Sequence, residues 1–400
     1  MGLSTTNRIK KCCMIRHSHK NPMIFEVNQM KRKWLAVGII LLFVGVTIAP
    51  AIAQNAEKSQ STSRGDWLYV GGSGPGNYTT IQSAINHAND SDTVYVFPGL
   101  YTENVVANKS IVLMGADKNT TIVDANNTGS CITLISRNVH VSGFTVQHSG
   151  DTEDSEFHDS GILSPFGSNY FNHVISDNII QENHDGIYYW GAQNITISYN
   201  IIHDNRRNGI DLDVGADYCT INHNRITNNG AEGIHVDDES STLNRVIANY
   251  LDNNADDGIV MYGYICNITM NHVSHSKNGI MVTGYYSRVL NNTLVNNDLG
   301  LSMTGSLQAV VEANSFENNT KDATFIHYLL HRFMLPFIIW PQITKWHANY
   351  WGQPPSGPKI IQGRMLLSQT PSLPGFPWCN FDFAPATTPY PDLSILGGLL

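Results

Sequence analysis

A short motif returns along the middle of this 400-residue chain every 21 to 25 residues. Each copy contains an Asn, a second Asn or a Ser five residues later, and then a Gly followed by Ile or Leu. A unit of this length cannot bury an apolar face by itself, whereas copies stacked as successive coils can. The repeat therefore predicts a solenoid, and its six full copies begin at Asn178, Asn200, Asn224, Asn249, Asn271 and Asn292.

The position of a residue within the motif predicts the direction of its side chain. Alternate side chains of a strand point to opposite faces, and we expect the residue after each Gly to point inward. Stacking would bring these residues into one interior ladder with a spacing of about 4.8 Å. The Asn residues are expected at bent, left-handed corners, with amides that hydrogen-bond along the stack. The predicted ladder consists of Ile187, Ile210, Ile234, Ile259, Ile280 and Leu301.

The ends of the repeat region also carry recognisable segments. Residues 74–124, which begin "GPGNYTTIQSAINHAND", predict a short amphipathic helix at 81–88 followed by four strands, and the tail contains "WHANYWG". Together with the repeat, these segments resemble right-handed parallel β-helix proteins of the pectin-lyase-like group. They are most similar to the NosD-type repeat proteins of archaeal cell surfaces, over about residues 66–325. The resemblance implies an all-β, single-stranded right-handed parallel β-helix with an N-terminal capping helix.

Residues 30–53 have the layout of an export signal. Three basic residues precede an apolar run from Trp34 to Ala49, and small residues follow up to Ala53. This pattern suits a cleaved signal peptide, and its length also suits an uncleaved membrane anchor. In both cases the bulk of the protein is expected outside the cell, secreted or at the cell surface. The expected organisation is a non-native or cytoplasmic extension (1–29), the signal or anchor (30–53), a linker (54–65), the β-helix (66–325) and a C-terminal cap (326–400).

Charge and metal-ligand content weigh against several classes of protein. Residues 1–33 hold eight basic residues and one acidic residue, so the remaining chain has a formal net charge of −16. An acidic body disfavours binding to nucleic acid. The six cysteines form no CxxC pair, and His327 and His331 have no third ligand beside them. The copper-associated role that the NosD resemblance suggests is therefore disfavoured, and no metal ligand is assigned.

The strand after Gly209 carries two carboxylates. In "NGIDLDV", Asp211 and Asp213 alternate with apolar residues, so both are predicted to point outward. The equivalent outward positions of neighbouring coils place aromatic, acidic and His side chains on one exposed sheet face. The candidate catalytic residues from this register are Asp211, Asp213, His235 and Asp237, and the candidate sugar-binding residues are Tyr188, Trp190 and Tyr262.

This face suits carbohydrate chemistry of two kinds. Asp213 and Asp237 are expected about 5 Å apart on adjacent coils, a spacing that suits retaining glycoside hydrolysis. Asp211 and Asp213 are expected about 6.5–7 Å apart along their strand, and wider pairs suit inverting hydrolysis. His235 or Tyr262 could instead remove a sugar C5 proton, as a uronate lyase or epimerase requires. Calcium is the one cofactor considered, because the layout resembles that of pectate lyases, which hold calcium with outward acids. The Asp-Pro-His and Gly-His-Gly motifs of related enzymes are absent, so the reaction type stays open.

Two classes of function follow from the sequence. The first is an exported, monomeric enzyme that acts on a polysaccharide or a cell-envelope glycan, touching the membrane only through its N-terminal segment. The second is a non-catalytic surface protein that binds glycans or builds the envelope. The remaining acids next to the site are expected to be solvated turn residues; they are Asp185, Asp204, Asp256 and Asp257.

Overall fold

The computed structural model describes residues 65–153, 158–166, 171–237, 240–306, 308–328, 344–366 and 375–392. The expected export segment and the extension before it lie outside the described residues. Within the described residues, helical segments fall short of the length and hydrophobicity that a bilayer-spanning helix requires. The described chain is a right-handed parallel β-helix, as the repeat and the resemblance predict.

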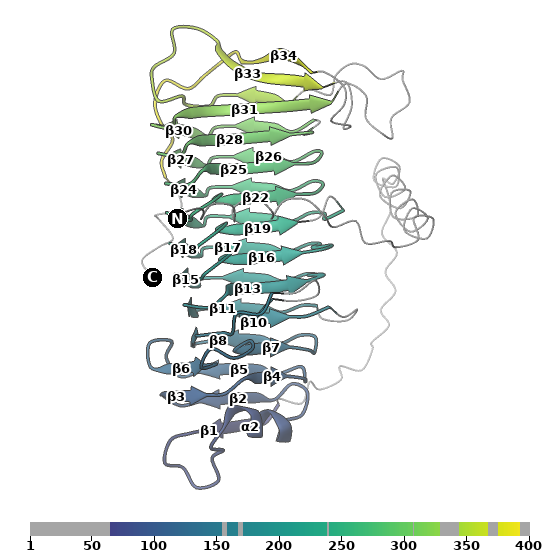
Figure 1. The fold of residues 1–400 in the computed structure, drawn as a ribbon, viewed down its shortest axis with the longest axis vertical. Helices are drawn as coiled ribbons and strands as arrows, with labels where there is room; N and C mark the ends of the chain where they lie inside the picture. Colours follow the sequence, from purple (N-terminus) through teal and green to yellow (C-terminus); the bar gives the residue numbers. More distant parts are fainter. Residues whose placement is uncertain are drawn as a thin grey trace, which may run out of the picture. The chain divides into compact units, whose positions relative to one another are not determined.

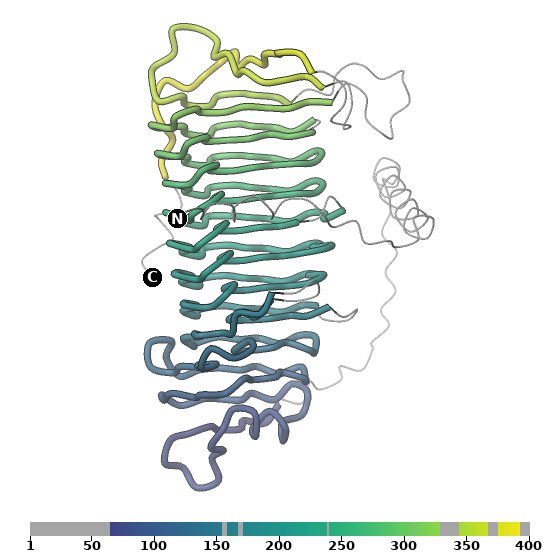
Figure 2. The backbone as a smooth tube through the Cα atoms, viewed as in Figure 1, coloured from purple at the N-terminus to yellow at the C-terminus, as the bar shows by residue number. Residues whose placement is uncertain are grey.

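Between the first and last coils, each coil contributes one strand to each of three columns, and each strand pairs in parallel with its equivalents in the adjacent coils (Figure 1). Figure 2 shows the backbone turning through these successive coils. The first column contains β1 (Trp67–Val70), β2 (Thr93–Val96), β5 (Val112–Gly115), β8 (His140–Ser142), β11 (Val174–Ser176), β14 (Thr196–Ser198), β17 (Thr220–Asn222), β20 (Arg245–Ile247), β23 (Asn267–Thr269), β26 (Arg288–Leu290), β29 (Val310–Glu312) and β32 (Lys345–His347).

The second column carries the candidate site. It contains β4 (Val105–Ala107), β7 (Ile132–Leu134), β10 (Ser160–Ser164), β13 (Asp185–Trp190), β16 (Ile210–Asp213), β19 (Ile234–Asp237), β22 (Ile259–Tyr262), β25 (Asn278–Thr283), β28 (Leu299–Thr304), β31 (Lys321–Tyr328) and β33 (Lys359–Leu366). The third column contains β3 (Gly99–Thr102), β6 (Thr121–Asp124), β9 (Thr145–Gln147), β12 (Ile179–Gln181), β15 (Ile201–His203), β18 (Arg225–Thr227), β21 (Tyr250–Asp252), β24 (His272–Ser274), β27 (Thr293–Val295) and β30 (Ser315–Glu317).

The predicted interior ladder is confirmed. Ile187, Ile210, Ile234 and Ile259 pair in register from β13 to β22, and none of them has any exposed surface. Each side chain therefore packs on its equivalents one coil away as well as on the other two columns. This arrangement buries apolar surface that a single coil could not bury, which is why the repeat predicts the fold so well.

The Asn ladder is also confirmed, with one correction to its geometry. The Asn224 side chain donates from Nδ2 to Asn249 Oδ1 at 3.0 Å, and its Oδ1 accepts from the backbone N–H of Asn200 at 3.0 Å. The left-handed residue is not the Asn but the one before it: His223 has φ +54° and Tyr199 has φ +58°. The bend therefore precedes the Asn, whose side chain then points inward and satisfies the bent backbone.

The two ends of the described chain differ from the repeat. The helix α2 (Ile81–His87) buries Ile81, Ala84 and Ile85, and Glu103 accepts hydrogen bonds from the amides of its first two residues. At the other end, β34 (Phe376–Asp382) runs antiparallel to β33. The strands β32 and β33 still pair in parallel with preceding coils, so the ladder continues beyond residue 325.

Candidate functional site

Four consecutive strands of the second column bring the predicted site residues together. The observed register pairs Tyr188 with Asp211 and Asp211 with His235, and it pairs Trp190 with Asp213 and Asp213 with Asp237. The register predicted from the sequence is therefore confirmed. We call Tyr188, Asp211, His235 and Val260 the inner row, and Trp190, Asp213, Asp237 and Tyr262 the outer row.

Three of the four inner-row residues are buried, contrary to the expectation for outward side chains, and His235 is half-buried. Tyr188 is 1% exposed and Asp211 is 4% exposed. His158, which precedes β10, lies over this row with its ring centroid 4.5 Å from that of Tyr188. The ring of Tyr188 is therefore covered, and it cannot serve as the sugar platform that the sequence suggested.

Asp211 and His235 form an ion pair within the inner row. The Nδ1 atom of His235 lies 3.2 Å from Asp211 Oδ1, and Asn208 Nδ2 donates to Asp211 Oδ2 at 2.9 Å. Burial alone would raise the pKa of Asp211, but the hydrogen bond and charge of His235 lower it. Burial alone would lower the pKa of His235, but the hydrogen bond and charge of Asp211 raise it to about 9. Both groups are therefore charged at neutral pH.

The pKa of Asp213 is shifted in the opposite direction to that of Asp211. Burial raises the pKa of its carboxyl group, and the nearby charge of Asp211 raises it further. The phenol of Tyr188 donates a hydrogen bond to Asp213 Oδ2 at 3.1 Å. A carboxyl group that retains its proton more readily than usual is suited to donate that proton during a reaction.

The outer row is the accessible part of the site. Asp237 is exposed, and Trp190, Asp213 and Tyr262 are half-buried. The exposed ring of Phe166 lies edge-on to Trp190, with 6.0 Å between the ring centroids. Large apolar groups on a wet sheet face are typical of ligand-binding surfaces.

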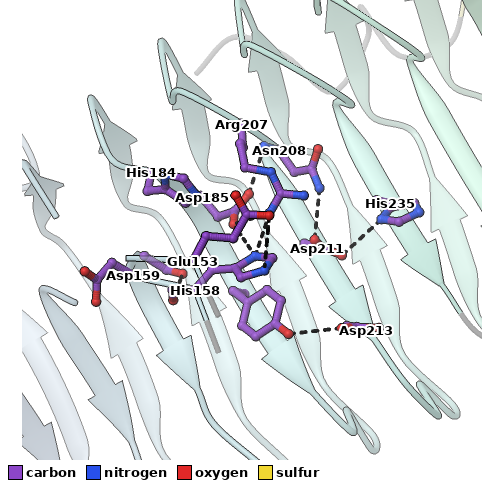
Figure 3. Close-up of polar contacts among 12 residues, drawn as sticks. Glu153, His158, Asp159, His184, Asp185, Arg207, Asn208, Asp211, Asp213 and His235 are labelled. Atoms are coloured by element: carbon purple, nitrogen blue, oxygen red, sulfur yellow. Dashed lines mark hydrogen bonds and ion pairs between the residues drawn. The ribbon is translucent and has the colours of Figure 1, made fainter. Parts of the chain in front are cut away.

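Asp185 is the clearest site residue that the sequence analysis missed. It was expected to be a solvated turn residue, but it has no exposed surface. Its Oδ1 accepts from the backbone N–H of Asn208 at 2.9 Å, and its Oδ2 lies 3.3 Å from Arg207 Nη1 and 2.9 Å from His158 Nδ1 (Figure 3). The buried carboxylate thus holds the turn before β16 and the residue that covers Tyr188.

The sequence carries a signal for this role, namely the position immediately before the Gly of the repeat. Asp185, Asn208 and Asp257 each stand immediately before the Gly of the repeat. The side chain of each accepts a backbone N–H from the next coil, for example Asn208 N to Asp185 and Asn278 N to Asp257 at 3.0 Å. Asp257 is buried too, whereas Asp204, which does not precede a Gly, is exposed as expected.

The buried cluster of His158, Asp185 and Asp211 does not fit a calcium site, and calcium at the outward acids Asp213 and Asp237 stays a prediction. Ligand atoms of His158, Asp185 and Asp211 lie within 4.8 Å of one another, but calcium prefers oxygen over imidazole nitrogen. The guanidinium of Arg207 lies 2.6 Å from His158 Nδ1 and already meets Asp185. Both oxygens of Asp211 accept hydrogen bonds, from His235 and Asn208. A cation in this cluster would have to displace these partners.

Comparisons with known proteins agree with the fold but assign no role to the site residues. Residues 110–270 match the model of a family described as "Right handed beta helix region". No curated protein sequence matches the chain.

Several solved structures resemble this one. An A-module of a mannuronan C-5 epimerase from Azotobacter vinelandii is 15% identical, with 68% of this chain and 91% of that chain covered and a TM-score of 0.46. A GH87 α-1,3-glucanase catalytic unit from Streptomyces thermodiastaticus is 14% identical, with coverages of 78% and 68% and a TM-score of 0.47. A pectate lyase is 14% identical, with coverages of 66% and 76% and a TM-score of 0.40. Similarities this low do not bear on the activity of this chain.

Proposed function

We propose that this β-helix protein binds a polysaccharide along the outer row and hydrolyses it. The observation that carries the proposal is the paired register of Asp213 and Asp237, flanked in the same row by Trp190 and Tyr262. Paired residues on adjacent strands lie about 4.8 Å apart, and carboxyl groups separated by about 5–5.5 Å suit retaining glycoside hydrolysis.

The two carboxyl groups take different roles in this proposal. Asp213, whose pKa is raised by burial and by Asp211, donates a proton to the oxygen of the scissile bond. Asp237 is exposed and attacks the anomeric carbon, forming a glycosyl ester that water then hydrolyses. Tyr188 and the Asp211–His235 ion pair are positioning groups beneath these carboxyl groups. The rings of Trp190 and Tyr262 contact the C–H faces of the sugars on either side.

Hydrolysis is favoured over a lyase or epimerase reaction by the state of His235. A base that removes a sugar C5 proton must be unprotonated at the working pH. With its pKa raised to about 9 by Asp211, His235 is mostly imidazolium at neutral pH, so only a small fraction of it is in the form that takes up that proton.

The test is incubation of the purified full chain with soluble neutral, amino and uronate polysaccharides, followed by measurement of new reducing ends. We expect Asp213→Asn to lower turnover by at least about 100-fold while binding persists, because the proton donor is lost. Asp237→Asn should have a similar effect. The matched control is Asp298→Asn, an exposed acid outside the row, which should retain full turnover.

Several outcomes would contradict hydrolysis. An unsaturated uronate product would indicate a lyase, and exchange of the C5 proton with solvent would indicate an epimerase. If Asp213→Asn keeps full turnover, Asp213 is not the proton donor.

A non-catalytic glycan-binding role is the second candidate. The observation that favours it is the closure of the inner row, in which Tyr188 and Asp211 are buried and hydrogen-bonded. In that case Trp190→Ala should weaken glycan binding, and no product should appear with any polysaccharide.

Export to the cell surface is part of the same proposal, and the apolar segment 30–53 supports it. Sequencing the N-terminus of native material tests the two forms of export. A terminus at Gln54 is expected for a cleaved signal, and a terminus before residue 50 would favour the membrane anchor.

A further inference from the structure

A hollow of about 180 Å³ lies at the corner where the second column leads into the first, near the Trp190 end of the outer row. Its described lining consists of two aromatic rings and three carboxamides, from Phe171, Asn172, Gln193, Asn194 and Tyr218. Gln193 follows Trp190 by three residues, so their Cα atoms lie within about 11 Å of each other. A sugar chain bound at the outer row can therefore extend into the hollow.

The lining of the hollow suits an uncharged sugar. A carboxamide both donates and accepts hydrogen bonds, and so do the hydroxyl groups of a sugar. Asn194 donates from Nδ2 to Asn172 Oδ1 at 2.7 Å, and the amide of Gln193 is exposed. The nearby carboxylate of Asp217 does not line the hollow, and its Oδ1 accepts from the backbone N–H and the hydroxyl of Thr242, each at 2.9 Å.

Tyr218 has a backbone conformation that a bulky side chain disfavours. Its φ is +57°, in the left-handed region. The equivalent corner residues of the three preceding coils are Asn138, Asn172 and Asn194, which are also left-handed and are joined by amide hydrogen bonds of 3.0 and 2.7 Å. Asn tolerates this conformation better than Tyr does, and Tyr218 is 58% exposed. The Tyr therefore adds backbone strain without adding burial, a combination typical of residues that bind a ligand.

We propose that the hollow is a subsite that binds one uncharged sugar unit of the polysaccharide held at the outer row. This inference rests on the proposed function and extends its site around the corner of the solenoid. The ring of Tyr218 contacts the C–H face of that sugar, and the amides of Gln193 and Asn194 bind its hydroxyl groups. Oligosaccharides that reach the hollow therefore bind more tightly than those that cover the outer row alone.

Binding of the full chain to oligosaccharides of two lengths tests the subsite. The probes are four-unit and six-unit oligomers of β-1,4-glucose, β-1,4-N-acetylglucosamine and α-1,4-galacturonate, and calorimetry measures their affinities. Three strand spacings separate Trp190 from Tyr262, so the outer row spans about 14 Å along the solenoid. A four-unit oligomer can cover this row without entering the hollow, whereas a six-unit oligomer can reach both.

The expected result is a gain in affinity with length. We expect each uncharged oligomer that binds to do so about tenfold more tightly in its six-unit form than in its four-unit form, because a stacked ring and amide hydrogen bonds are added. The galacturonate oligomers should gain less from length, because the described lining of the hollow offers no cation to a carboxylate.

Tyr218→Asn assigns the gain from length to the hollow. The variant restores the residue type of the three preceding corners, so its unfolding temperature should stay the same or rise. The gain from length should fall to about twofold or less, because the stacked ring is lost. A residue that served the fold alone would instead lower the stability when replaced. The matched control is Tyr286→Asn, at an exposed and left-handed residue of the same corner three coils away, and it should keep the full gain.

The outcomes separate the subsite from the proposed function. Equal affinity for the two lengths, a full gain in Tyr218→Asn, an equal loss of the gain in Tyr286→Asn, or a gain confined to galacturonate would overturn the subsite and leave the outer row intact. Asp213→Asn should stop turnover while the gain from length persists, since the hollow lies outside the reacting groups. If no oligomer of any series binds, both the subsite and the proposed function fail.

Discussion

Two side chains that touch each other, Asp211 and His235, have pKa values that move in opposite directions for one physical reason. Each group is buried enough to lose water, and each recovers that loss only when the other is charged. The stabilisation that the ion pair gives to the folded state therefore depends on pH, and this dependence can be measured.

We expect the free energy of unfolding to fall as the pH rises from about 6.5 through 9. The folded pKa of His235 is about 9 and its ordinary value is 6.5, so the folded state binds more protons in this window. The stabilisation is complete below the ordinary value and is lost as the pH passes the folded one. The loss should be of the order of 1–3 kcal/mol, measured by urea unfolding across this window.

His235→Gln supplies the control for this prediction. The variant keeps a polar side chain of similar reach but cannot be protonated. Its stability should change much less between about pH 6.5 and 9 than that of the unaltered protein. If the two proteins lose stability in parallel, the dependence arises elsewhere and the ion pair is not its source.

At the scale of the element, each strand is held in register by side chains at its corners as well as by its own backbone. Asn224 is 2% exposed and donates from Nδ2 to Ile197 O, Asn222 O and Asn249 Oδ1 at 2.9–3.0 Å. One side chain thus links three successive coils. The left-handed residue before it leaves backbone groups that need these partners.

We expect Asn224→Ala to destabilise the protein by about 2–4 kcal/mol, because several buried polar groups lose their partners together. Chemical unfolding measures the effect. The control is Asn267→Ala, at a half-buried outward position of β23, where the side chain accepts a local hydrogen bond from Thr269. That variant should lose less than about 1 kcal/mol. If both variants lose a similar amount of stability, the Asn ladder contributes little to the free energy of unfolding.

At the scale of the whole described chain, stability is a sum of coils and of the interfaces between them. A defect in one coil should therefore weaken its neighbours more than distant coils. The interior ladder offers the sharpest place to introduce such a defect, since Ile234 is fully buried between Ile210 and Ile259.

Ile234→Asp should unfold the middle coils, because an unpaired buried charge costs several kcal/mol. Hydrogen exchange should show lost protection in β16, β19 and β22 before it spreads to the first coils. The matched control is Ile247→Asp, at an outward and half-buried position of β20, which should keep the protection of these strands. If hydrogen exchange in Ile234→Asp shows the same protection of these strands as in the unaltered protein, Ile234 does not belong to an interior ladder.

Much of the architecture and the register of the site could be predicted from the sequence alone. The Gly-Ile positions and the Asn spacing report the repeat directly, and a period of two within each strand then separates inward from outward residues. This is why Asp211, His235 and Ile234 were predicted at their observed register positions.

Burial across the site was decided only by the tertiary structure. A period of two says which face a side chain points to, but it cannot say what covers that face. His158 comes from an irregular segment before β10, 30 residues before Tyr188 in sequence, and its position follows from the contact with buried Asp185. The same contact places Arg207 beside the inner row. The repeat thus determined which residues share a face, and His158, which lies outside the repeat, helped decide which of them a ligand can reach.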